Sequence, residues 1–326
     1  MILSTLDKSR KGGAYEQIPS LVLGQRWTPQ LNSRNMMKVV LCVWIEPYIE
    51  NDLSFCVWPV HTPTTSKEVL TLSASTSPLP YTGNKSCIVN TILSVMPKHT
   101  VYIDPCMGSA EVFFRKPRAE KEILNDYNGD LVNLFRVIQN NEKLAYLLGR
   151  LYLSINGELA FKQNKDRLKG VPNILDDVIE TSQIFYDASW EDIQNAAAFL
   201  ENQVYSFSST GQTFGIARRD MSQRLLRLMS AYNRIRDAII LHRDYKDVIT
   251  YAACPGSFIL LDPPYKGTED MYSKANFDIE QHDILFSFMS EVNQQHHGEV
   301  KFLITYNNDP YIRGLAEKHG FDTFVQ

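Results

Sequence analysis

The stretch TVYIDPCMGSAEVFFRKPRAEKEILND (Thr100–Asp126) holds the pattern that decides the fold. It begins with TVYID and ends with KEILND, two short runs rich in strand-forming residues, and each run closes on an aspartate. Between them, GSAEVFFRK has the character of a helix start. A strand, a helix and a second strand in this order are typical of α/β proteins, in which helices connect the parallel strands of one sheet.

The same alternation extends to both sides of this stretch. Apolar residues at helical spacing predict a helix within Lys85–Pro97 and a long amphipathic helix within Asp130–Ser154. Further elements are predicted as a helix over Met221–Ile240, a strand over Gly256–Asp262, a helix over Asp278–Val292 and a strand over Val300–Asn307. The expected fold class is therefore α/β with a parallel sheet.

Two segments do not follow the alternation. Residues 143–225 contain helical pieces such as SWEDIQNAAAFLENQVY and then the loop SFSSTGQTFGIARR (Ser206–Arg219), so the middle of the chain is expected to interrupt one sheet-forming domain. Residues 1–75 contain strand-like pieces at Lys38–Ile45 and Phe55–Val60 and a run rich in serine and threonine. We expect an N-terminal extension of unknown role that ends in a flexible linker.

Composition excludes several classes of protein. The formal net charge of -4 provides no global basic field, so a site for a polyanion must be a local patch. The five cysteines form no C-x-x-C pair, which predicts neither a metal site nor a disulfide framework but reduced thiols, as in a cytosolic protein. The first residues lack the apolar core of a signal peptide, and the run VVLCVWI (Val39–Ile45) is too short to span a bilayer.

Asp104 and Asp126 mark a candidate ligand site, because open parallel sheets bind ligands beyond the carboxyl ends of their strands. Their separation is close to the ~20 residues between a glycine-bearing first turn and an acid that binds ribose hydroxyls. Gly108 and Ser109 let the backbone approach a ligand, and the helix behind them offers free N–H groups. The full G-x-G-x-x-G pattern is absent, so an ordinary strand-to-helix turn and a site for a nucleoside ligand with a carboxylate both remain open.

A smaller motif, YTGNK (Tyr81–Lys85), precedes the first predicted helix. Gly83 permits a tight turn, and Lys85 could reach a carboxylate or a phosphate. The alternative is a solvated loop.

In GSFILLDPPYKG (Gly256–Gly267), an apolar strand ends on a carboxylate followed by two prolines and a tyrosine. Asp262 can accept one N–H of an exocyclic amine on a flat ring, and the carbonyl of Pro263 can accept the other, so that the nitrogen lone pair points at an electrophile. Proline fixes the backbone and removes a competing N–H. Asp262 would stabilise the charge that develops on the nitrogen, and Tyr265 offers a face for stacking. A strand that simply ends in a proline turn is the alternative.

A base in duplex DNA must be flipped out of the stack to reach such a pocket, and the protein then needs a basic surface for the DNA backbone. Gly211–Lys246 is locally basic, although a solvated helix face with internal ion pairs, such as Arg234 with Asp237, would give the same composition. Its basic residues are Arg218, Arg219, Arg224, Arg227, Arg234, Arg236, Arg243 and Lys246. The loop YSFSSTGQTFG before it suits a hairpin that reaches toward DNA, but also any exposed hairpin.

Several motifs together resemble one known family. SPLPYTGNKSCI, YIDPCMGSAEVFF, EILNDYNGDLVNLFRVIQ, IRDAIILHRDYKDVI and FILLDPPYKGTEDMY occur in the order and spacing of the Dam-like, D12-class DNA adenine-N6 methyltransferases, over about residues 77–326. The resemblance implies a Rossmann-like methyltransferase sheet with helices on both faces, interrupted by a mostly helical target-recognition domain with a hairpin. It divides the chain into residues 76–142 and 236–326 as the catalytic domain and 143–235 as the target-recognition domain, after the extension of residues 1–75.

The resemblance also implies roles for individual residues. The catalytic residues would be Asp262, Pro263, Pro264 and Tyr265. The residues that bind the cofactor, S-adenosyl-L-methionine, would be Tyr81, Gly83, Lys85, Asp104, Pro105, Cys106, Gly108, Asp126 and Asp262. The residues that contact DNA would be Ser208, Thr210, Gln212, Arg218 and Arg219. Cys106 departs from the family pattern, which usually has phenylalanine there, and members usually continue through further strands, so the edge of the sheet beyond Val300–Asn307 is expected to be incomplete.

The expected activity is site-specific methylation of a flipped-out adenine in double-stranded DNA, by a monomer in the cytoplasm of a bacterium or encoded by a phage or mobile element. A cognate restriction endonuclease would be a further partner. Two alternatives remain open: an N4-cytosine DNA methyltransferase, which acts on a similar amine, and an inactive or truncated remnant that binds DNA or cofactor without turnover. Methylation of a protein amide is less compatible with the sequence, since Asn is expected in place of Asp262 there.

Overall fold

A computed structural model describes residues 76–176, 188–216, 220–268 and 277–325, together with the backbone of one strand, Met37–Cys42. All of them belong to one unit, Arg34–Gln326. In the described residues, the strands are β1 (Met37–Cys42), β2 (Val101–Asp104), β3 (Lys121–Asn125), β4 (Ile239–Leu241), β5 (Ser257–Leu261), β6 (Lys301–Asn307) and β7 (Asp322–Val325). The helices are α1 (Val89–Val95), α2 (Glu111–Arg115), α3 (Gly129–Gln139), α4 (Asn141–Tyr152), α5 (Glu158–Lys169), α6 (Trp190–Tyr205), α7 (Ser222–Ile235), α8 (Tyr245–Ala252), α9 (Ile279–Gln295) and α10 (Pro310–Lys318).

These strands form one sheet in the order β4-β3-β2-β5-β6-β1-β7, and every recorded pairing is parallel. From β2 the chain moves outward through β3 to β4, whereas β5 lies on the other side of β2 and leads to β6. The order therefore reverses between β2 and β5. Ligands of open α/β sheets bind at this kind of switch point, beyond the carboxyl ends of the strands.

Alternate residues of the strands enter two apolar cores, one on each face of the sheet. Tyr102 and Phe258 belong to the first core, which also contains residues of α1, α2, α3, α4, α6 and α7. Ile103 and Ile259 belong to the second, which contains residues of α8, α9 and α10. Side chains of a strand point alternately to the two faces, so both faces are covered by helices, as the sequence predicts.

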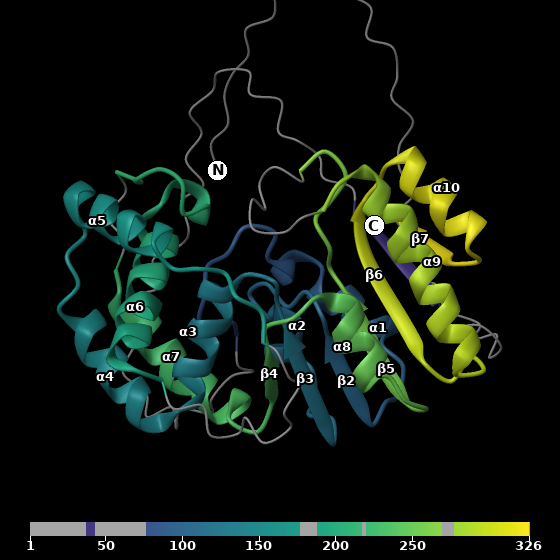
Figure 1. Ribbon diagram of the computed structural model, residues 1–326, viewed down its shortest axis with the longest axis horizontal. Coiled ribbons are helices and arrows are strands. Elements are labelled where there is room, and N and C mark those ends of the chain that lie inside the picture. The colour runs from purple at the N-terminus through teal and green to yellow at the C-terminus, as the bar shows by residue number, and fades with distance from the viewer. Residues whose placement is uncertain (1–36, 43–75, 177–187, 217–219, 269–276, 326) are drawn as a thin grey trace, which may run out of the picture. The chain divides into compact units, whose positions relative to one another are not determined.

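The middle helices gather beside α3 near the β4 edge, as Figure 1 shows for α4, α5, α6 and α7. They share the first apolar core with the sheet, since Leu200 of α6 and Tyr102 of β2 are both fully buried members of it. α6 begins with a capping box, in which Ser189 and Asp192 satisfy each other's backbone N–H groups. In the part of the chain that the structure describes, no helix is both long and apolar enough to cross a bilayer.

Two element predictions are wrong in detail. The long helix predicted within Asp130–Ser154 is two helices, because Asn140 takes an extended backbone and its side chain caps α4 by accepting from the N–H of Lys143. The helix predicted to continue to Ile240 ends at Ile235, and Ile239–Leu241 is the short strand β4.

The strand-like piece predicted at Lys38–Ile45 corresponds to β1, which pairs with β6 and with β7. The segment expected to be a separate extension thus contributes a strand to the sheet. Beyond β6, where an incomplete edge was expected, the sheet continues through β1 and β7. The second strand-like piece, Phe55–Val60, lies outside the described residues.

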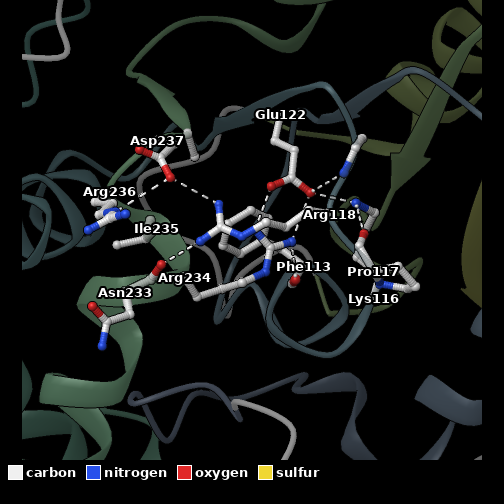
Figure 2. Close-up of polar contacts among 12 residues, drawn as sticks. Phe113, Lys116, Pro117, Arg118, Glu122, Asn233, Arg234, Ile235, Arg236 and Asp237 are labelled. Atoms are coloured by element: carbon white, nitrogen blue, oxygen red, sulfur yellow. Dashed lines mark hydrogen bonds and ion pairs between the residues drawn. The ribbon is translucent and has the colours of Figure 1, made fainter.

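A buried network of charges joins α7 to the sheet (Figure 2). The carboxylate of Glu122, on β3, accepts hydrogen bonds from Nη2 of Arg234 at 2.8 Å and from Nζ of Lys116 at 2.6 Å. The Arg234 guanidinium also lies 3.7 Å from the ring centroid of Phe113 and donates to its carbonyl oxygen. All three charged side chains are less than a tenth exposed. Burial raises the pKa of Glu122, but the hydrogen bonds from Arg234 and Lys116 outweigh it and hold that pKa below its ordinary value.

Candidate active site

Two aspartates flank the switch point of the sheet. Asp104 is the last residue of β2, and Asp262 directly follows β5, the neighbouring strand. Asp126 directly follows β3, on the other side of β2. Because all three strands are parallel, their carboxyl ends bring these carboxylates to the same edge of the sheet.

A cavity of about 550 Å³ lies at this edge, a volume within the range of small-molecule sites. It is lined by eleven of the residues that the sequence predicted for the cofactor and for catalysis: Tyr81, Gly83, Lys85, Asp104, Pro105, Cys106, Gly108, Asp126, Asp262, Pro263 and Pro264. Segments that are far apart in the sequence therefore meet around one space. Their assigned roles stay predictions, but the geometry brings the groups together.

The turn after β2 is shaped to hold Asp126. Gly108 and Ala110 both have left-handed backbone angles, with φ of 48° and 55°. The resulting turn directs the N–H of Gly108 to Oδ2 of Asp126 at 2.9 Å, while Oδ1 accepts from the N–H of Asn128 at 2.9 Å. The carboxylate is thus fixed beside the turn, where a backbone without a side chain at Gly108 leaves room for a ligand.

The cavity is strongly acidic at its base. Burial, with a smaller contribution from the nearby carboxylates of Asp262 and Asp126, raises the pKa of Asp104 to about 8, against the lowering effect of the Tyr102 hydroxyl, which donates to Asp104 at 2.9 Å. Burial also raises the pKa of Asp126 to about 6, against the lowering effect of its backbone hydrogen bonds. A ligand with positive charge would therefore be favoured here.

Asp262 is held from two sides. Its Oδ2 forms an ion pair with Nζ of Lys85, which also donates to the carbonyl of Gly83 at 2.6 Å. Its Oδ1 accepts a hydrogen bond of 2.5 Å from Oγ1 of Thr305, a fully buried residue of β6. The loop before α1 and the neighbouring strand together set the orientation of this carboxylate.

Tyr265 does not line the cavity as the prediction required of a stacking residue. Its ring packs toward Tyr306 of β6, with the two ring centroids 5.8 Å apart, and Nζ of Lys85 lies 5.1 Å from the centroid of the Tyr265 ring. Tyr306 is in turn held by a hydrogen bond between its hydroxyl and Nδ1 of His282 at 2.8 Å. Residues 269–276, which follow this turn, lie outside the described part of the chain.

The predicted hairpin is present in part. Ser206 and Phe214 form an antiparallel bridge, and the loop between them includes left-handed Ser208, Ser209 and Gly211. Thr210 and Gln212 line the cavity, and Ser208 does not. Arg218 and Arg219 lie outside the described residues.

In the described part of the basic segment Gly211–Lys246, the basic residues do not all lie at the surface. Arg234 is buried against Glu122. It does not form the ion pair with Asp237 that the alternative interpretation required; Asp237 pairs instead with Arg118 and Arg236. Arg243 donates to the backbone carbonyl of Asp176. These arginines hold the fold together, so the composition of the segment was a poor guide to its exposed charge.

Sequence reasoning missed the opposite wall of the cavity. It is formed by Lys165, Leu168 and Lys169 of α5 and by Phe199, Asn202 and Gln203 of α6. In each helix the three residues follow the spacing i, i+3, i+4, which places them on one face. That spacing was readable in the sequence, but which face meets the cavity depends on tertiary packing. Asp244 and Tyr245, at the start of α8, also line the cavity and were missed.

The fold and the site together define a class: an α/β protein of Rossmann-like type, with a nucleoside-sized acidic cavity at the switch point of a parallel sheet. The model of one family, the D12 class N6 adenine-specific DNA methyltransferases, matches residues 81–324. The chain belongs to this family.

Individual relatives agree with the family. The chain is 26% identical over 255 residues to the DNA N-6-adenine-methyltransferase of Escherichia phage P1, which covers 74% of this chain and 31% of the relative. It is 22% identical over 236 residues to the modification methylase LlaI of Lactococcus lactis subsp. lactis, covering 68% and 36%. It is 22% identical over 219 residues to the type II methyltransferase M.CviBI of Paramecium bursaria Chlorella virus NC1A, covering 67% and 77%. The chain thus spans about a third of the length of the first two relatives.

Proposed function

We propose that this chain is a site-specific DNA methyltransferase that transfers a methyl group from S-adenosyl-L-methionine to N6 of an adenine flipped out of double-stranded DNA. One observation carries the proposal: Asp262 and Pro263, at the end of β5, share a single cavity with Asp104, Gly108 and Asp126. The groups suited to an exocyclic amine and those suited to a nucleoside cofactor therefore face the same space.

The residues that line the cavity fit this cofactor. S-adenosyl-L-methionine carries a positive sulfonium and an ammonium group, which match a cavity whose buried carboxylates have raised pKa values. Asp126, fixed by the N–H of Gly108, is placed to accept from ribose hydroxyls, as acids after the second strand of such sheets do. When bound, the cofactor would supply an electrophilic methyl group.

The residues around Asp262 would then orient the target amine. The Asp262 carboxylate accepts one N–H, and the carbonyl of Pro263 accepts the other, which leaves the nitrogen lone pair free to attack. As the bond to the methyl carbon forms and the bond from that carbon to sulfur breaks, the nitrogen would gain positive charge, which the fixed carboxylate would stabilise until one N–H proton leaves. Thr305 and Lys85 hold the carboxylate in place before the base arrives, so little reorganisation is needed at the moment of reaction.

Transfer of a tritiated methyl group to unmethylated DNA tests this proposal against its alternatives. An active adenine methyltransferase labels the DNA, and long-read mapping of DNA from cells expressing the chain then gives the base and the sequence context. Label found only on cytosine N4 would replace the adenine assignment. DNA or cofactor binding with no transfer would favour an inactive remnant.

Thr305→Val is expected to lower kcat about 10- to 100-fold. The substitution keeps the shape of the side chain and removes a hydrogen bond to a carboxylate, an interaction that contributes about 1.5–3 kcal/mol. Affinity for S-adenosyl-L-methionine should stay unchanged, and Thr305→Ser should restore most of the rate. Steady-state kinetics with saturating cofactor measures the effect; equal rates for the valine and wild-type proteins would exclude a positioning role for this hydroxyl.

Affinity for S-adenosyl-L-methionine is expected to increase as pH rises from about 6 to about 8. Burial raises the pKa of Asp126 to about 6 and of Asp104 to about 8 in the free protein, and a cationic ligand favours the ionised carboxylates. Binding therefore releases protons, with a gain of at most about tenfold in affinity per pH unit for each proton released. The same raised pKa of Asp104 stabilises the free protein at low pH, and this contribution is lost as pH rises through about 8.

Calorimetric titrations at pH 6 and pH 8 measure this dependence. Asp104→Asn should flatten the upper part of the pH profile, because the amide does not titrate. An affinity that falls over this range in the wild-type protein would contradict the assignment of the carboxylates to a cationic ligand.

A further inference from the structure

The helical wall of the cavity contains two buried amides. Asn202 and Gln203 are 3% and 6% exposed, and together with Phe199 they lie on the face of α6 that lines the cavity. Asparagine and glutamine are mostly found at protein surfaces. Two adjacent buried amides on a cavity wall therefore require a reason.

The amide oxygens of both residues are buried without a hydrogen-bond partner among the residues that the structure describes. Such acceptors destabilise a folded protein, because they have lost water and gained no donor. Asn195, two turns earlier on the same helix, shows the usual arrangement: it is 7% exposed, and its Oδ1 accepts from Nη1 of Arg167 at 3.0 Å. The same helix thus satisfies a buried amide oxygen away from the cavity and, among the described residues, leaves two without a donor where it lines the cavity.

The hairpin loop holds this wall in position. The amide nitrogen of Gln203 is so close to Gly211 that a Cβ there would lie 2.9 Å from it. The loop is itself fixed by Thr82, which donates to the carbonyl of Ser209 at 3.2 Å, and by Lys165, which donates to the carbonyl of Gln212 at 2.6 Å. The amide of Gln203 is therefore packed against a fixed loop before any ligand binds.

We propose that Asn202 and Gln203 bind the adenine ring of the cofactor in the cavity, accepting N–H groups from its exocyclic amine; the proposal rests on the function proposed above. An amide presents an acceptor and a donor side by side, which matches the amine and the neighbouring ring nitrogen of adenine. The flipped nucleotide carries the same ring, but Asp262 and the carbonyl of Pro263 already accept both N–H groups of its amine in the function proposed above. The adenine of the cofactor is therefore the ligand that these amides would bind.

A comparison of Asn202→Leu with Asn195→Leu distinguishes an effect on ligand binding from an effect on protein stability. Asn202→Leu removes an acceptor that has no donor in the free protein, so its melting temperature should be unchanged or higher. Binding of the cofactor should weaken about tenfold or more. Asn195→Leu removes a partner of Arg167, so it should lower the melting temperature and leave binding unchanged. Gln203→Met serves as the second variant if Asn202→Leu does not fold.

Two measurements test this assignment. Calorimetric titration with S-adenosyl-L-methionine in the absence of DNA reports the cofactor, and kcat/KM for unmethylated plasmid DNA at saturating cofactor reports the target base. A loss of cofactor affinity supports the proposal. Unchanged cofactor affinity, with normal stability, overturns it, and so does a loss that is confined to kcat/KM for DNA. If the wild-type chain binds the cofactor but transfers no methyl group, the proposed function fails, and the titration alone decides this inference.

Discussion

Asp262→Ala is expected to reduce methyl transfer by a factor of about 1000 or more, to background in most assays, while cofactor binding stays measurable. The carboxylate is the charged acceptor that stabilises the positive nitrogen in the transition state, and removing one such preorganised group costs about 100- to 1000-fold. It also orients the amine, so the loss of positioning adds to the loss of charge.

Single-turnover transfer of tritiated methyl groups measures the rate, and calorimetry measures cofactor binding in the same preparations. Asp262→Asn should fall between the alanine variant and wild type, since the amide keeps one acceptor oxygen and carries no charge. Asp283→Ala is the matched control, because this carboxylate pairs with Lys318 at the surface. Near-normal turnover by Asp262→Ala would contradict the proposed mechanism.

Glu122→Ala is expected to lower the free energy of unfolding by about 3–5 kcal/mol, the cost of leaving buried charges without their partner. Glu122 is the only carboxylate shown to contact both Lys116 and Arg234 within the described residues (Figure 2). Its loss would leave an ammonium and a guanidinium buried beside each other, and both would oppose folding.

Denaturant unfolding of the wild-type and Glu122→Ala proteins measures this difference in the free energy of unfolding. The matched control is Asp237→Ala, whose side chain is 64% exposed where it pairs with Arg118. Exposed pairs contribute about 0–1 kcal/mol, so this variant should be close to wild type. A Glu122→Ala protein as stable as the control would show that the network does not anchor α7 to the sheet.

Local patterns predicted the elements that carry the acidic groups. β2, β3 and β5 are short apolar runs that end at an aspartate or one residue before it, and their alternation with helices was sufficient to predict a parallel sheet. The placement of Asp104, Asp126 and Asp262 at one edge followed from that topology.

Features that depend on distant contacts were missed. For Arg234 the sequence left two possibilities open, a basic surface and an ion pair with Asp237, but its partner Glu122 lies on β3, which no local pattern around Arg234 reveals. β4 has three residues and closely follows α7, so no change of periodicity marks it. Asn202 and Gln203 look like ordinary polar positions of α6, and only packing against the cavity distinguishes them.

The most direct test of the central claim is nucleoside analysis by mass spectrometry, after incubation of the purified chain with S-adenosyl-L-methionine and unmethylated DNA. The site described here predicts N6-methyladenine as the product, formed by the wild-type chain and absent with Asp262→Ala. Unmodified adenine in DNA that carries N4-methylcytosine, or no methylated nucleoside from a chain that binds both ligands, would contradict it.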